Sequence, residues 1–108
     1  MNLGGIYWIT NKSSVAHPYV LFKYIEDTSE CYLCAITSNT KKANIPGNVL
    51  LDSSEGNLDK QSVVEVSKVV VLQSSEVKEQ IGILSQKRVA EILQGMQFIE
   101  TSFLHNRL

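Results

Sequence analysis

The chain has 108 residues, a net charge of −1 at pH 7 and 19% charged residues. This length fits a single core, so we expect residues 1–108 to form one domain. The near-neutral charge argues against a strongly basic nucleic-acid binder. No run approaches the roughly 20 apolar residues that a membrane span needs, and MNLGGIYWIT lacks the features of a signal peptide. We therefore expect a cytoplasmic protein that makes no contact with a membrane.

The first two-thirds of the chain predicts short strands separated by polar turns. β-branched, aromatic and apolar residues gather in short runs, and Gly, Pro, Asn, Asp and Ser punctuate them. The expected strands are residues 5–10, 18–25, 30–36, 48–51, 62–66 and 69–72. A turn at residues 27–29 makes a hairpin, while residues 37–47 and 52–61 are expected loops. This spacing predicts a small barrel or sandwich whose last strand is residues 69–72.

The pattern changes after Gln73, where helical periodicity replaces alternation. A short helical turn is expected over residues 75–80. Ser85 is a suitable N-cap for a longer amphipathic helix. The apolar stripe of that helix recurs at three-to-four-residue spacing and comprises Val89, Ile92, Leu93, Met96 and Ile99. Such a stripe predicts packing against the core or a second subunit.

Two cysteines in ECYLCAI, Cys31 and Cys34, have the spacing of a redox or zinc motif. The surrounding residues predict a strand, in which residues three apart point to opposite faces. No second Cys/His pair is present to complete a metal site. We therefore interpret them as two packed thiols in a reducing compartment.

Three strand residues have side chains that bear on function. Tyr7 and Trp8 are adjacent, so one is expected in the core and the other exposed. An exposed aromatic can stack a base, although packing in the core or a dimer is the simpler interpretation. Glu65 alternates with Val64 and Val66, which predicts a solvent-facing carboxylate.

Four segments, in order and at similar separations, resemble the MazF/PemK toxin family. They are Gly5-Ile6-Tyr7-Trp8, His17-Pro18-Tyr19-Val20-Leu21, Ala35-Ile36-Thr37-Ser38-Asn39, and Ser62-Val63-Val64 followed by Ile81-Gly82-Ile83-Leu84; Pro46-Gly47-Asn48-Val49-Leu50-Leu51 strengthens the match. The order and spacing of the segments together make the resemblance specific. It spans nearly the whole chain.

The resemblance implies a mainly β fold, an SH3-like small barrel of the CcdB/MazF type with a C-terminal α-helix. It also implies a homodimer and a toxin of a type II toxin–antitoxin system. Such a toxin is an endoribonuclease (mRNA interferase) that cuts single-stranded RNA sequence-selectively without a metal or other cofactor. A cognate antitoxin inhibits it.

The sequence departs from the family pattern at His17, where the family usually places a catalytic Arg before the proline. This chain resembles a branch in which His-Pro is the form used. Thr37 matches the family threonine at the end of the third strand. Family members often have an acidic-Gln pair after the Ser-Val-Val segment, whereas here Ser67-Lys68 stands there, so the sequence does not establish RNA contacts from that region.

Metal-free RNA cleavage needs a group that takes the 2′ proton, one that protonates the departing 5′ oxygen, and one that stabilises the charged phosphorane. His17 suits proton transfer or, when protonated, charge stabilisation, and the sequence leaves both roles open. Thr37 is the second catalytic candidate because its hydroxyl can bind the scissile phosphate. The candidates for RNA binding are Lys12, Ser38, Asn39, Lys41 and Lys42.

Two alternative functions remain at this stage. Loss of the family Arg would be consistent with a catalytically degenerate protein that binds RNA or antitoxin without cutting. A gyrase poison of the related CcdB branch is disfavoured, because those toxins rely on a C-terminal Trp-Gly-Ile and this chain ends FLHNRL.

Overall fold

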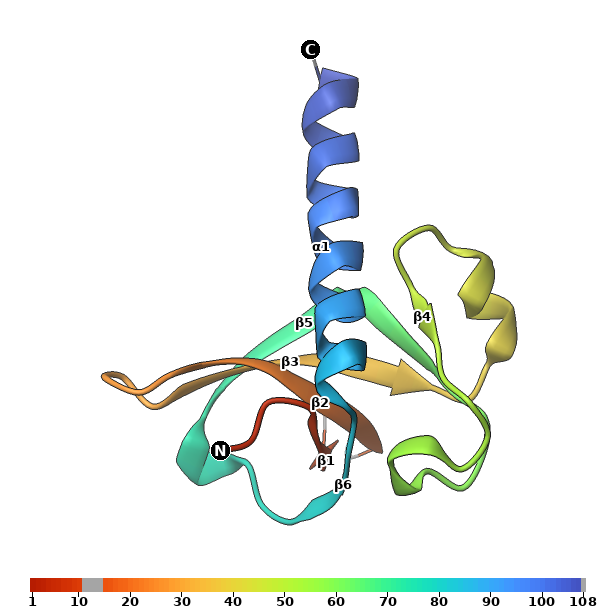
Figure 1. The fold of residues 1–108 in the computed structure, drawn as a ribbon. Coiled ribbons are helices and arrows are strands. Elements are labelled where there is room, and N and C mark those ends of the chain that lie inside the picture. The colour runs from red at the N-terminus through yellow and green to blue at the C-terminus, as the bar shows by residue number, and fades with distance from the viewer. Residues whose placement is uncertain (11–14, 108) are drawn as a thin grey trace.

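The structure, a computed structural model, describes residues 1–10 and 15–107, with side chains described as far as residue 102. It contains one antiparallel sheet with the strand order β4-β5-β3-β2-β1-β6. The strands are β1 (Gly5–Thr10), β2 (Ala16–Ile25), β3 (Glu30–Thr37), β4 (Val49–Leu50), β5 (Val63–Gln73) and β6 (Gln80–Ile83). The sheet curls into a partly open barrel, and helix α1 (Gln86–Arg107) rises from one of its faces (Figure 1). The expected mainly β barrel with a C-terminal helix is confirmed.

Two hydrophobic clusters form, one on each face of the sheet. The cluster under α1 includes Ile6, Val20, Cys34, Val64 and Ile92, and the opposite face holds Tyr7, Leu21, Cys31, Leu33 and Val77. Alternation along each strand distributes its side chains between the two clusters. The two cysteines are buried free thiols on opposite faces, as their spacing predicts.

The C-terminal helix begins as expected. The backbone N–H of Arg88 donates to Ser85 Oγ (3.2 Å), which is the N-cap bond that satisfies a free amide of the first turn. Val89 and Ile92 are buried, Met96 and Ile99 pack on the same core, and Leu93 is exposed. Most of the apolar stripe therefore faces the chain's own core.

Strand β5 differs most from the prediction of separate strands at residues 62–66 and 69–72. It is one strand with a large bulge, because Cys34 pairs with Val69 while the next residue, Ala35, pairs with Glu65. The bulge lets β5 bend sharply (Figure 1). The prediction that residues 69–72 form the last strand is also wrong, since β6 follows and pairs with β1.

The solvent-facing position predicted for Glu65 is wrong as well. Glu65 is 7% exposed, and its carboxylate lies 3.4 Å from the ammonium group of Lys68. Residues 66–68 form the bulge, so Lys68 lies within it and reaches the side chain of Glu65. Every residue from Val63 to Val66 is buried, so alternation exposes neither face of this half of β5.

The two predicted loops contain short 3₁₀ helices: η1 (Thr40–Asn44) and η2 (Glu55–Asn57). A third, η3 (Ser74–Glu76), occupies the start of the helical turn predicted at residues 75–80, and β6 begins at the end of that range. No helix in residues 1–10 and 15–107 is long and apolar enough to cross a membrane.

Candidate functional site

The register of the β2–β3 hairpin brings His17 and Thr37 to the same end of the sheet. The last ladder pair is Tyr19 with Ala35, and the register continued by two residues sets His17 opposite Thr37. A bulge between Leu21 and Lys23 shifts this register by one residue. Without that bulge, Ser38 would stand opposite His17 instead.

A cavity of about 610 Å³ opens at this end of the sheet. His17, Thr37 and Ser38 line it, so the structure brings three predicted site residues together. The rest of its described lining comprises Trp8, Ala16, Pro18, Ile36, Asn57, Leu58, Asp59, Lys60, Ser62 and Ile81. Strands β1, β2, β3 and β6 and the loop after β4 thus all contribute to one concave surface.

The aromatic pair behaves as alternation predicts. Tyr7 is 4% exposed in the core, whereas Trp8 is 50% exposed and lines the cavity. Burial raises the pKa of the Tyr7 phenol, which keeps it neutral and structural. The exposed indole of Trp8 supplies a flat apolar wall on which a base can stack.

The hydroxyl of Thr37 is oriented by its own turn. The backbone N–H of Asn39 donates to Thr37 Oγ1 (3.2 Å), so the threonine hydroxyl hydrogen remains able to donate to a ligand. The side chain of Asn39 is used in the same turn, because its Oδ1 accepts from the backbone N–H of Lys41 (3.2 Å) and caps η1. Asn39 therefore has a structural task in addition to its predicted RNA contact.

The other predicted RNA-binding residues lie apart from the cavity or outside the described residues. Lys41 and Lys42 belong to η1, and the described lining includes neither of them. Lys12 lies outside the described residues. Among residues 1–10 and 15–107, no three His, Cys, Asp or Glu side chains are grouped so as to hold a metal ion.

Sequence reasoning missed the contribution of the loop after β4. Asn57, Leu58, Asp59 and Lys60 line the cavity, although residues 52–61 read only as a polar connection. The loop reaches the cavity because η2 packs against β6, where the Asn57 side-chain amide donates to the carbonyl of Ile81 (2.8 Å). Since β6 was not predicted from the sequence, this placement had no visible signal.

A curled antiparallel sheet with a C-terminal helix is the architecture that the MazF/PemK resemblance implies. Residues 4–99 match the family model of PemK-like, MazF-like toxins of type II toxin–antitoxin systems. The chain belongs to this family.

Individual relatives agree with the family match. The chain is 34% identical over 62 residues to Endoribonuclease MazF6 of Mycobacterium tuberculosis (strain ATCC 25618 / H37Rv), which covers 57% of this chain and 54% of that relative. It is 35% identical over 60 residues to Endoribonuclease MazF of Staphylococcus saprophyticus, over 56% of this chain and 50% of the relative. The aligned segment thus spans about half the length of these curated relatives.

A solved structure supports the fold across nearly the full chain. The MazE–MazF crystal structure (Form-II) from Deinococcus radiodurans superposes with a TM-score of 0.72 at 19% sequence identity, covering 92% of this chain and 93% of that chain. At this identity the comparison establishes the barrel and its helix.

Proposed function

We propose that this chain is a single-domain toxin endoribonuclease that cuts single-stranded messenger RNA in the cytoplasm and is inhibited by a cognate antitoxin. The observation that supports it is the cavity, which His17, Thr37 and the exposed ring of Trp8 line from three strands. Two relatives, named Endoribonuclease MazF6 and Endoribonuclease MazF, share part of this sequence, and the MazE–MazF structure shares the fold.

The cleavage step requires no reagent beyond the RNA itself. The ribose 2′ oxygen attacks the adjacent phosphorus, its proton passes to a base, and the 5′ oxygen leaves with a proton from an acid. The products are a 2′,3′-cyclic phosphate and a 5′-hydroxyl end. Histidine ordinarily titrates near pH 6.5, so it can act in either proton transfer at neutral pH.

We assign proton transfer to His17 and phosphate binding to Thr37. The hydroxyl of Thr37 accepts from the Asn39 N–H with one lone pair, and its hydrogen can donate to a non-bridging phosphate oxygen. Trp8 stacks a base beside the scissile bond, which is how unpaired RNA is commonly held. Sequence selectivity then depends on which base fits against this wall.

The test is incubation of the purified protein with a long RNA under excess EDTA. We expect cleavage to persist and the 5′ fragments to end in a cyclic phosphate. Activity that appears only with added magnesium would refute the mechanism. Tight RNA binding without any cut would support the catalytically degenerate alternative instead.

Variants at His17 separate its two possible roles across pH 5–9. If His17 transfers protons, His17→Ala and His17→Arg each lose roughly 10²–10⁴-fold in rate. If it acts only as a cation, His17→Arg keeps the activity of the wild type. Thr37→Val preserves the side-chain shape and isolates the hydroxyl. Should His17→Ala cut as fast as wild type at every pH, the active site lies elsewhere.

A further inference from the structure

The cavity has few charged groups, and one of them is a lysine that the sequence did not single out. Among its described lining residues, His17, Asp59 and Lys60 have ionisable side chains. Lys60 makes no salt bridge within the described part of the chain. A lysine without an acidic partner keeps its full charge available for an anionic ligand.

The backbone that presents Lys60 is fixed at the base of its loop. The Leu51 N–H donates to the Ser62 carbonyl (2.9 Å), and the Gln61 side-chain amide donates to the Leu51 carbonyl (3.0 Å). The hydroxyl of Ser62 donates to the carbonyl of Lys60 itself (2.8 Å). These bonds hold the carbonyl of Lys60 and the two residues that follow it, Gln61 and Ser62.

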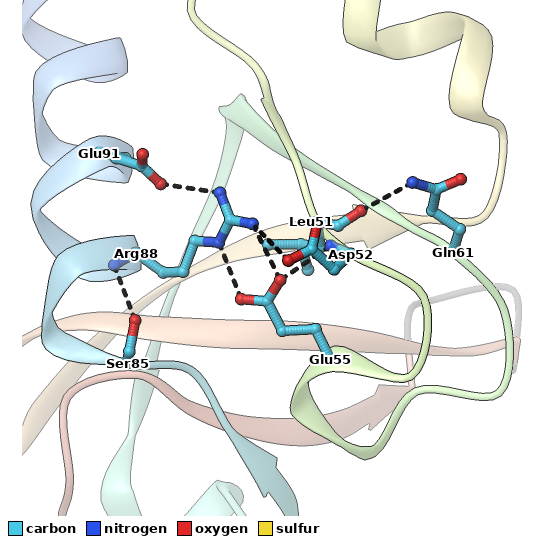
Figure 2. Close-up of polar contacts among 7 residues, drawn as sticks. All are labelled: Leu51, Asp52, Glu55, Gln61, Ser85, Arg88 and Glu91. Carbon is cyan, nitrogen blue, oxygen red and sulfur yellow. Dashed lines mark hydrogen bonds and ion pairs between the residues drawn. The ribbon is translucent and has the colours of Figure 1, made fainter.

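The tip of the same loop is anchored to α1. Arg88 Nε and Nη2 donate to the two carboxylate oxygens of Glu55 (2.8 and 3.0 Å), and Nη1 donates to Glu91 (2.9 Å) (Figure 2). Glu55 also accepts from the Asp52 N–H (2.8 Å). The Glu55 and Arg88 side chains are about four-fifths buried. The loop is therefore a braced element, which is the property that a binding group needs for preorganisation.

We propose that Lys60 contacts the scissile phosphate and stabilises the negative charge that develops there during cleavage. This inference rests on the proposed function. The phosphorane gains charge as the 2′ oxygen attacks, and a cation beside it, carried on a backbone that is held in place, lowers the barrier. His17 is then left to proton transfer, and the charge that Arg provides in the family pattern comes from a different element of the fold. Asp59 repels phosphate, so the RNA backbone passes on the Lys60 side.

The experiment compares Lys60→Gln and Lys60→Arg with wild type, using single-turnover cleavage in EDTA and binding to a short 2′-deoxy-substituted RNA that cannot be cut. Lys87→Gln is the matched control, because Lys87 is an exposed lysine in the first turn of α1. Lys41→Gln tests a lysine outside the cavity lining. Thermal unfolding of each variant confirms that it folds.

We expect Lys60→Gln to lose roughly 10²-fold in the cleavage rate, as for removal of one transition-state donor, with Lys60→Arg recovering most of it. Lys41→Gln should weaken RNA binding with little change in the single-turnover cleavage rate of the bound RNA. Lys87→Gln should resemble wild type in both measurements. A Lys60→Gln protein that is folded and cuts at the wild-type rate overturns the assignment of Lys60 alone.

A wild-type protein that does not cut would instead overturn the proposed function, and binding then decides the role of Lys60. Loss of one phosphate contact lowers the slope of log affinity against log salt by about 0.7 for single-stranded nucleic acid. An unchanged slope in Lys60→Gln would show that Lys60 does not meet phosphate.

Discussion

Replacement of Arg88 by Met should destabilise the chain by about 2–4 kcal/mol. Three hydrogen bonds join its guanidinium to Glu55 and Glu91, and its side chain is 19% exposed. Truncating one partner of a fully buried pair costs about 3–5 kcal/mol, and partial solvation here reduces that figure. For a domain of this size the loss corresponds to a fall of roughly 10–20 °C in Tm.

The effect of Arg88→Met should depend on pH in a defined direction. The hydrogen bonds from Arg88 hold the pKa of the Glu55 carboxyl below its ordinary value, against a smaller opposing effect of burial, and the Asp52 N–H adds to the lowering. A carboxyl whose folded-state pKa is lowered adds stability above its unfolded pKa, near 4.3, and loses it as pH falls through the folded value. The difference in unfolding free energy between wild type and Arg88→Met should therefore be largest near pH 7 and decrease below about pH 4.

Chemical and thermal unfolding at pH 7 and pH 3 measure this difference. A double-mutant cycle with Glu55→Gln should give a coupling energy of about 1–3 kcal/mol. Lys87→Met is the control in the neighbouring exposed position, for which a change within about 0.5 kcal/mol is expected. A Tm loss under about 2 °C, or an equal loss at both pH values, would refute the reasoning.

Three further predictions concern packing and partners. Gly82→Ala should destabilise by about 1–3 kcal/mol, because a Cβ there would collide with the carbonyl oxygen of Gly56; unchanged unfolding would contradict the contact. The chain should form a homodimer through exposed apolar surface such as Val71, and sedimentation showing only monomer at micromolar concentration would exclude it. An acidic antitoxin tail should bind near Lys41 and Lys42, so charge reversal at both should weaken that complex, as titration calorimetry would detect.

The sequence predicted local features well and long-range ones less well. Alternation correctly divided Tyr7 from Trp8, and Ser85 correctly marked the start of α1, since each depends on neighbouring residues. The continuity of β5 was missed, because the polar residues Ser67 and Lys68 resemble a turn between two strands. Only the pairing with β3 shows that they belong to a bulge within one strand. Glu65 was misplaced for the same reason.

The residues of the candidate site show the same contrast between local and long-range features. His17 and Thr37 were selected by family resemblance, and the structure places both in one cavity. Lys60 was not selected, because its position depends on a loop that is held by α1 and β6, elements distant in the sequence. No local pattern in a polar loop reports which remote strand it will pack against.

The two cysteines lie on opposite faces of the sheet, so their thiols can report separately on the opening of each face. Cys31 lies among the side chains on one face of the sheet and Cys34 lies beneath α1, and burial raises the pKa of the Cys34 thiol to about 12. Each thiol reacts with a labelling reagent only when its own face opens to solvent. Labelling rates of Cys31→Ser and Cys34→Ser, each with one remaining thiol, would therefore tell whether the helix can lift from the barrel before the sheet itself comes apart.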